Sequence, residues 1–226
     1  MGRKTTETSQ ALIDVYERLF RRYGPQQWWP GETPFEVIIG AILTQSTAWT
    51  NVEKAIANLK SAHVLGPESL HSITTDELAA LIRPSGYYNA KAAKVKAFVD
   101  RLCDKYSSVL DRLFELDTAS LRHELLSIHG IGPETADSIL LYAAYRPVFV
   151  IDAYTKRIFS RLGIASANDS YEAYQRLFME NMPHDEKLFN EYHALLVRHG
   201  KDVCRKSPRC NDCCLASPSK KGCRKP

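Results

Sequence analysis

The chain of 226 residues is 44% hydrophobic and 25% charged, with a formal net charge of +4. This composition allows a sizeable core in one or two compact domains. No apolar run is long enough to cross a bilayer and no secretory leader is visible, which excludes a membrane-spanning or secreted protein. We therefore expect a soluble, cytoplasmic protein without a membrane partner, associated with the nucleoid if the source is bacterial or archaeal. The mild positive charge suits a polyanion, and basic residues gather at 83–96 and 201–225.

Helical spacing of apolar residues runs through nearly the whole chain and predicts an all-α fold. Residues 1–9 are polar and expected to fray, and the first amphipathic helix, 11–20, should end before Gly24-Pro25. Further helices are expected at 35–43, 51–59, 75–81, 90–106, 113–115, 153–162, 171–181 and 186–200, with two more inside 121–145. No strand alternation, long repeat or low-complexity linker interrupts this pattern.

The segment 121–145 predicts two helices joined by a tight turn, because apolar residues follow helical spacing on both sides of Gly130-Ile131-Gly132-Pro133. Two glycines let the backbone turn sharply, and proline fits the first turn of the second helix. The turn presents a row of amide N–H groups at the positive end of a helix, which suits a phosphate. This is a helix-hairpin-helix pattern with Ile131 as its apolar pin. The alternative is an ordinary helix-helix connection.

Five of the six cysteines fall in the last 23 residues, and this clustering indicates a local metal site. A structural zinc site with four thiolates is one interpretation. The sixth cysteine, Cys103, lies on an amphipathic helix and is expected to be a core thiol.

The hairpin, the following Val150-Ile151-Asp152 and the cysteine-rich end together resemble the endonuclease III superfamily of DNA base-excision glycosylases, from about Tyr23 to Cys223. The resemblance implies two helical domains with a groove between them. One would combine 1–30 with 147–226, and the other would be a helical barrel, 31–146. It also implies DNA contacts from the hairpin residues Gly130, Ile131, Gly132 and Thr135.

By this resemblance, Asp152 faces the sugar of a flipped-out nucleotide as the catalytic residue. Breaking an N-glycosidic bond builds positive charge on the deoxyribose, and a fixed carboxylate stabilises that charge or activates the attacking water. Taken alone, an aspartate after Val150-Ile151 predicts a helix N-cap. Its distance from the hairpin favours the catalytic interpretation.

Two turns resemble the segments with which the family distorts DNA. Tyr87, in a Gly-containing turn, corresponds to the wedge opposite the lesion, and Gln45 to the residue that fills the hole left by the flipped base. Inserted side chains offset part of the unstacking cost of a few kcal/mol. The alternatives are half-buried packing for Tyr87 and a helix-end cap for Gln45.

Two positions separate this chain from other branches of the superfamily. Glu134 stands where bifunctional members carry the lysine that forms a Schiff base, so we expect little or no β-lyase activity. Ala41 stands where adenine-excising members carry a glutamate, which disfavours adenine excision.

The tryptophans resemble the 3-methyladenine DNA glycosylase branch, in which aromatic faces stack on a damaged base. Stacking and cation-π attraction both favour an N-alkylated purine, which is positively charged. The predicted base pocket consists of Trp28, Trp29, Pro30, Trp49, Glu134 and Lys201. Alternatively, Trp28 and Trp29 anchor the N-terminal helix to the core.

The spacing Cys204-x5-Cys210-x2-Cys213-x9-Cys223 resembles the 4Fe-4S loop of the superfamily. The last interval is longer than the family's usual interval of about five residues. Cys214 stands where the family usually has proline, so the choice between Cys213 and Cys214 stays open, as does zinc.

The resemblance thus implies a monomeric, monofunctional DNA glycosylase that releases 3-methyladenine or 7-methylguanine from duplex DNA containing a damaged base. A glycosylase for oxidised pyrimidines is the nearest alternative. A catalytically silent iron-sulfur DNA-binding protein is an alternative of another class.

Overall fold

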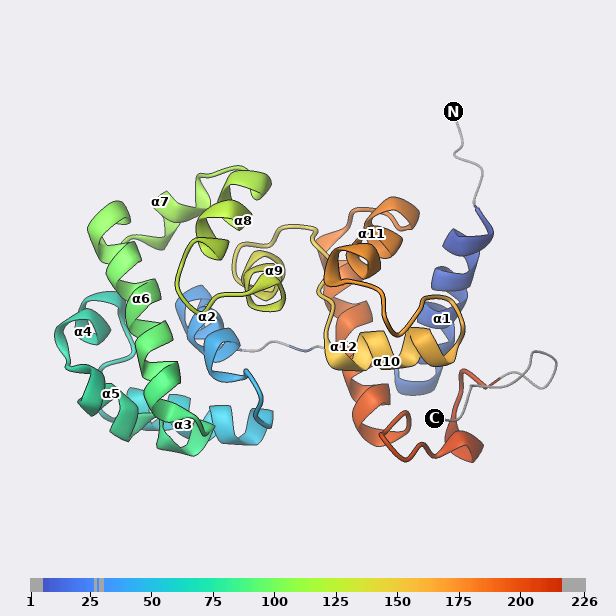
Figure 1. The fold of residues 1–226 in the computed structure, drawn as a ribbon, viewed down its shortest axis with the longest axis horizontal. Coiled ribbons are helices and arrows are strands. Elements are labelled where there is room, and N and C mark those ends of the chain that lie inside the picture. Colours follow the sequence, from blue (N-terminus) through green and yellow to red (C-terminus); the bar gives the residue numbers. More distant parts are fainter. Residues whose placement is uncertain (1–5, 27, 29–30, 217–226) are drawn as a thin grey trace. The chain divides into compact units, whose positions relative to one another are not determined.

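The computed structural model describes residues 6–26, 28 and 31–216, and these residues form α-helices, two short 3-10 helices and loops (Figure 1). The predicted all-α fold is confirmed, since this part of the chain contains no strand. None of its helices is both long and apolar enough to cross a membrane. The chain divides into two compact units. We call Trp29–Arg146 the hairpin unit, and Met1–Trp28 with Pro147–Pro226 the aspartate unit.

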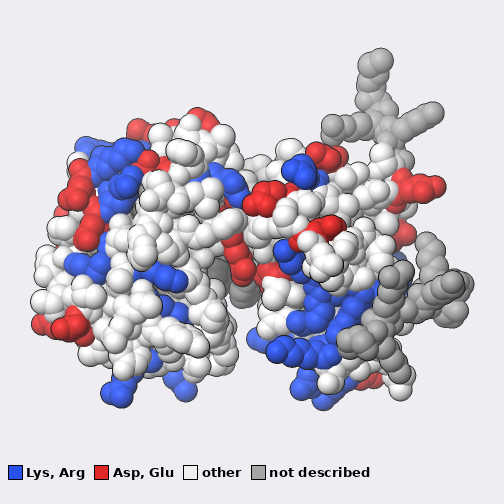
Figure 2. All heavy atoms as spheres, viewed as in Figure 1, with Lys and Arg blue, Asp and Glu red and all other residues white. Residues whose placement is uncertain are grey.

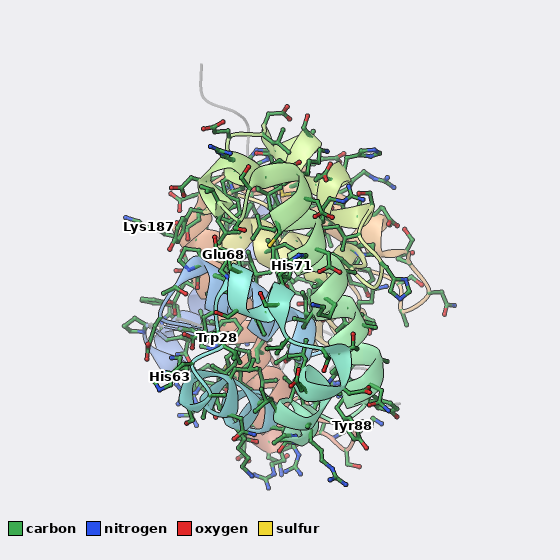
Figure 3. The ribbon with its side chains drawn as sticks, turned by 90° about the vertical axis from the view of Figure 1, so that its left-hand side faces the viewer. Trp28, His63, Glu68, His71, Tyr88 and Lys187 are labelled. Carbon is green, nitrogen blue, oxygen red and sulfur yellow. The ribbon has the colours of Figure 1, made fainter. Side chains whose placement is uncertain are left out.

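The hairpin unit is built around its longest helix, α6, which packs against α2, α4, α5 and α7. In Figure 3, which faces this unit, α4 with Glu68 and His71 lies against α6. The helices are α2 Pro34–Leu43, α3 Trp49–Ser61, α4 Pro67–Ser72, α5 Thr75–Leu81, η1 Arg83–Ser85, α6 Tyr88–Tyr106, α7 Leu110–Phe114, α8 Thr118–Leu126 and α9 Pro133–Tyr142.

Side chains of α6 also close the ends of neighbouring helices. The ammonium of Lys96 donates to the carbonyl oxygens of Leu70, His71 and Ile73 at 3.1, 2.6 and 3.1 Å. These carbonyls lie at the C-terminal end of α4, where a cation satisfies the last acceptors and complements the helix dipole. The apolar residues of α6 face the core at helical spacing, among them Val95, Phe98 and Leu102.

The aspartate unit contains α1 Glu7–Tyr23, α10 Ala153–Arg161, α11 Tyr171–Asn181, α12 Glu186–Asp202 and η2 Cys210–Asp212. Its core centres on Phe149, whose ring stacks on Phe178 with centroids 3.8 Å apart and meets Phe189 and Tyr192 edge-on. The four residues 148–151 are all buried. The chain therefore enters α10 from an apolar segment that packing holds in place, and Asp152 follows that segment directly.

The predicted helices at 75–81 and 171–181 have the observed bounds. Two predictions were wrong. Helix α1 begins at Glu7, because the hydroxyl of Thr6 caps it by accepting from the amide of Ser9, so fraying does not extend to Ser9. Helix α4 was not predicted, since its six residues bury a single leucine, Leu70, and show no amphipathic repeat.

Candidate active site and DNA-binding elements

The predicted hairpin joins α8 to α9, and its turn depends on Gly130. Gly130 has φ +82°, and a Cβ there would overlap the side chain of Lys94. Ile131 is buried as the apolar pin, and Pro133 opens α9. Gly132 differs from the prediction, because its φ of −92° suits any residue. Nothing lies within 4 Å of a Cβ placed on Gly132, so the space beside this residue is open.

The two helices of the hairpin are tied together by a buried ion pair. Arg122 on α8 donates from Nε and one terminal nitrogen to the two oxygens of Asp137 on α9, at 2.7 and 3.1 Å. Asp137 is fully buried. This bidentate geometry fixes the angle between α8 and α9. No side chain caps α9 at Gly132, so the helix begins as an anion-binding N-terminus would.

Gln45 lies against the hairpin turn, 85 residues further along the chain. Its Nε2 donates to the carbonyl oxygen of Gly130 at 3.1 Å and to Oγ1 of Thr135 at 3.0 Å. Its Oε1 accepts a hydrogen bond from Nζ of Lys94. The structure thus brings together three of the predicted DNA-binding residues. The alternative that Gln45 caps the end of its own helix is wrong.

Tyr87 is an exposed aromatic residue on a strained backbone. It is 77% exposed and has φ 46°, directly after Gly86 at φ 68°. A left-handed tyrosine costs of order 1–3 kcal/mol, and such strain is concentrated at functional sites. The alternative of half-buried packing is wrong, because most of the Tyr87 side chain is exposed.

Two predicted pocket residues of the hairpin unit occupy helix starts. Trp49 begins α3, and its ring lies on the backbone of Gly40 in α2, where a Cβ would come within 3.2 Å of Cη2. Glu134 is exposed in the first turn of α9. An acidic residue is favourable at that position because the N-terminal end of a helix is positive.

Asp152 is the N-cap of α10. Its Oδ1 accepts a hydrogen bond from the amide of Thr155 at 2.7 Å, so the N-cap interpretation is confirmed. The side chain is 11% exposed. The positive end of α10 stabilises this anion, and the cap fixes its orientation. Its other oxygen, Oδ2, lies 3.7 Å from Nε2 of His193.

His193 is the residue of this site that the sequence did not reveal. It lies on α12 and is buried, and its ring centroid is 6.0 Å from that of Trp28. Burial lowers the pKa of His193, although the charge of Asp152 acts to raise it. The imidazole is therefore neutral near pH 7. A single histidine on the buried face of a helix resembles any core residue, and its contact with Asp152 requires the fold.

Within the aspartate unit, the carboxylate of Asp152 thus lies next to the neutral imidazole of His193, which in turn lies next to the indole of Trp28. Trp28 is half-buried and labelled in Figure 3. Two further residues of the predicted pocket, Trp29 and Pro30, lie outside the described residues. Lys201, also predicted for the pocket, is exposed near the end of α12.

His199 and Gly200, which precede Lys201, contribute to the packing of the aspartate unit. Nδ1 of His199 is 2.9 Å from the hydroxyl of Tyr23, and its Nε2 is 3.5 Å from Sγ of Cys213. Burial lowers the pKa of His199 to about 4. A Cβ at Gly200 would come within 2.7 Å of Cβ of Tyr154, so glycine permits the close approach of α10 and α12.

The five described cysteines are free thiols. Cys204 is buried, and Arg161 donates to its Sγ at 3.3 Å. Burial raises the pKa of Cys213, and charge on Cys204 and Cys210 raises it further, so these three thiols are electrostatic neighbours. Within residues 6–26, 28 and 31–216, no three His, Cys, Asp or Glu side chains stand together to hold a metal. The fourth predicted ligand, Cys223, lies outside this part of the chain. Cys103 is half-buried, which corrects the predicted core thiol.

Positive charge gathers on one part of the aspartate unit. Figure 2 shows Lys and Arg side chains concentrated below α10 and around the C-terminal end of α12. Two arginines of α10 act within the fold: Arg157 donates to the carbonyl oxygens of Cys204 and Gly200, and Arg161 to those of Arg205 and Lys206. The cysteine segment is thereby bound to the helix that Asp152 begins.

A helix-hairpin-helix followed by a carboxylate at a helix N-cap defines a helical DNA repair protein. The chain belongs to the HhH-GPD superfamily of base excision DNA repair proteins, whose family model matches residues 39–184. It is a DNA glycosylase of base excision repair.

Relatives of this chain include a protein of Methanocaldococcus jannaschii assigned as a DNA repair glycosylase, 46% identical over 205 residues that cover 90% of this chain and 93% of the relative. Endonuclease III of Sulfolobus acidocaldarius is 31% identical over 80% of this chain and 79% of its own length.

Two solved structures share the fold. The 3-methyladenine DNA glycosylase of H. pylori, bound to 1,N6-ethenoadenine, is 27% identical with a TM-score of 0.74, covering 87% of this chain and 98% of that one. An endonuclease III–DNA complex is 23% identical with a TM-score of 0.80, covering 97% of both chains.

Acidification should destabilise the aspartate unit through His193. The fold holds this residue neutral with a pKa below the unfolded value of about 6.5, so the unfolded chain binds more protons and the free energy of unfolding falls as the pH drops below about 6.5. In His193→Gln, the free energy of unfolding should change less steeply with pH between about pH 7 and pH 5. The slope should be smaller by up to about 1 kcal/mol per pH unit.

Urea unfolding at several pH values measures this slope. The exposed His184, changed to glutamine, is the matched control and should leave the slope as in the wild type. Equal slopes for wild type and His193→Gln would contradict the assignment.

Proposed function

We propose that the protein is a monofunctional DNA glycosylase that flips an alkylated purine, 3-methyladenine or 7-methylguanine, out of duplex DNA and hydrolyses its N-glycosidic bond. The observation that carries this proposal is the succession of Asp152, His193 and Trp28 within one unit. The likeness to a 3-methyladenine DNA glycosylase over 87% of the chain supports the substrate class.

In this proposal Asp152 acts on the sugar. As the bond between C1′ and the base nitrogen breaks, its electron pair passes to the base and positive charge grows on the deoxyribose, where a fixed carboxylate stabilises it. Water then bonds to C1′ and gives its proton to Asp152 or to solvent. Burial lowers the pKa of His193, so this residue is neutral near pH 7. A neutral imidazole does not offset the negative charge of Asp152.

The base is held by aromatic faces and leaves readily. An N-alkylated purine is cationic and becomes neutral when it takes the bonding electrons, so it needs little help from a general acid. Trp28 and Trp49 supply stacking and cation-π attraction. We assign Trp29, Pro30, Glu134 and Lys201 to the same pocket by similarity to the 3-methyladenine branch.

The hairpin unit binds and distorts the duplex. The turn Gly130-Ile131-Gly132 with Thr135 receives backbone phosphate, Gln45 fills the gap left by the flipped nucleotide, and Tyr87 enters the opposite strand. The exposure of Tyr87 and the contact of Gln45 with the hairpin support these roles. We propose that the protein acts on DNA as a monomer.

Base release from methylated duplex DNA should depend on Asp152. Asparagine caps a helix as well as aspartate does, so Asp152→Asn keeps α10 and removes the charge. We expect release of methylpurines to fall by a factor of about 10² or more. Chromatography of the released bases measures this, with circular dichroism to verify the fold and duplexes carrying neutral oxidised pyrimidines or uracil as comparison substrates.

The other outcomes separate the alternatives. Asp152-dependent release of oxidised pyrimidines, without methylpurine release, would favour the endonuclease III-like function that the 31% identical Sulfolobus relative suggests. DNA binding without any base release, unchanged in Asp152→Asn, would favour a silent DNA-binding protein.

The lyase step should be missing because Glu134 has no amine. A Schiff base with the sugar needs a neutral amine nucleophile, and the resulting imine leads to strand cleavage. We expect wild-type protein to leave abasic sites that break only after alkali, whereas Glu134→Lys should gain nicking without alkali and trapping by borohydride. The substitution Glu134→Gln is the control without an amine. Efficient trapping of the wild type would overturn this part of the proposal.

For the cysteine segment we propose a 4Fe-4S cluster held by Cys204, Cys210, Cys213 and Cys223. The spacing of these cysteines along the sequence supports it, and the contact of Cys213 with His199 favours Cys213 over Cys214. Protein isolated without oxygen should contain about four irons per chain. Cys213→Ser should lose them, whereas Cys214→Ser should keep them. Zinc in place of iron, or iron loss in Cys214→Ser, would contradict the assignment.

A further inference from the structure

Helix α6 carries a lysine that joins two DNA-facing loops. Lys91 is 2% exposed, and its Nζ donates to the carbonyl oxygens of Leu43 at 2.8 Å and Ser85 at 2.6 Å. Leu43 ends α2 two residues before Gln45, and Ser85 ends η1 two residues before Tyr87. One buried ammonium group therefore connects the backbone positions at which the Gln45 loop and the Tyr87 loop begin.

A second lysine, one helical turn further along α6, reaches Gln45 itself. Nζ of Lys94 donates to Oε1 of Gln45, while Nε2 of Gln45 donates to Gly130 and Thr135. The stem of Lys94 fills the space beside Gly130 that a Cβ would need. The Gln45 amide is thus oriented from both ends, with its oxygen toward a cation and its nitrogen toward the hairpin turn.

The charges explain why lysines occupy these positions. The acceptors named here are neutral oxygens, so no carboxylate among them offsets a positive charge on Lys91 or Lys94. Burial lowers the pKa of Lys91, and the charge of Lys94 lowers it further. A charged donor also makes a stronger hydrogen bond to an amide oxygen than a neutral donor does.

We propose that Lys94 is a positioning residue for DNA distortion, which sets the orientation of the Gln45 amide and so its entry into the duplex, while Lys91 holds the Gln45 and Tyr87 loops in register. The proposal rests on the role given above to Gln45. It assigns Lys94 no contact with the reacting atoms, so its effect must act through Gln45.

A double-mutant cycle tests this dependence. The readout is the fluorescence of 2-aminopurine placed next to a tetrahydrofuran abasic-site analogue in duplex DNA, recorded at saturating protein, because unstacking raises that fluorescence. Lys94→Met should reduce the rise at least fivefold. Lys94→Arg, which keeps a charged donor, should restore most of it. In a Gln45→Ala background, Lys94→Met should add nothing.

Two controls separate positioning from folding and from net charge. Lys54→Met removes one exposed positive charge of α3 and should leave the fluorescence rise unchanged. Thermal unfolding of Lys94→Met should match the wild type, because Lys94 is only half-buried.

The failures are distinguishable. If Gln45→Ala keeps the full fluorescence rise, the role given to Gln45 under the proposed function is wrong, and the inference about Lys94 is wrong with it. If Gln45→Ala loses the rise but Lys94→Met keeps it, or if the two losses add, the inference alone is overturned. Methylpurine release is measured separately, so the proposed substrate class is tested independently of Gln45 and Lys94.

Discussion

The placement of Asp152 at the first turn of α10 is the constraint on which the proposed chemistry depends. One carboxylate oxygen closes the helix by accepting from Thr155, which leaves the other oxygen to face His193 and any ligand. The cap fixes the rotamer of Asp152, and the helix end favours the anion that the proposed mechanism sets against the sugar cation. The buried segment 148–151, packed through Phe149, then sets where the cap stands.

In the proposed function the two units contribute different groups to base excision. The aspartate unit supplies the carboxylate, the neutral imidazole and an aromatic face, whereas the hairpin unit supplies the turn proposed to bind phosphate, the Gln45 amide and the exposed Tyr87 ring. In each unit a polar side chain fixes a helix end: Asp152 caps the start of α10, and Lys91 donates to the carbonyl oxygen of Leu43 at the end of α2. Apolar packing holds the helices in place, and these hydrogen bonds orient the functional side chains next to the helix ends.

Local rules were enough to predict most of the helices and the hairpin, but not the short helix α4, because amphipathic spacing, Pro133 and Gly130 each report on a few neighbouring residues. They were not enough for contacts across the chain. His193 meets Asp152 from 41 positions away in the sequence, and the buried ammonium of Lys91 satisfies carbonyls that belong to two other elements. A lysine between alanines on an amphipathic helix is expected to be exposed to solvent. The burial of Lys91 therefore becomes visible only in the folded structure.

The most direct test of this account is a crystal structure of Asp152→Asn bound to duplex DNA with a 2′-fluoro-7-methylguanosine, whose bond resists hydrolysis. We expect a flipped methylguanine stacked on Trp28, its C1′ beside the side chain at position 152, and Gln45 in the vacated space. A methylguanine left in the base stack, or flipped to a place remote from both Trp28 and position 152, would contradict it.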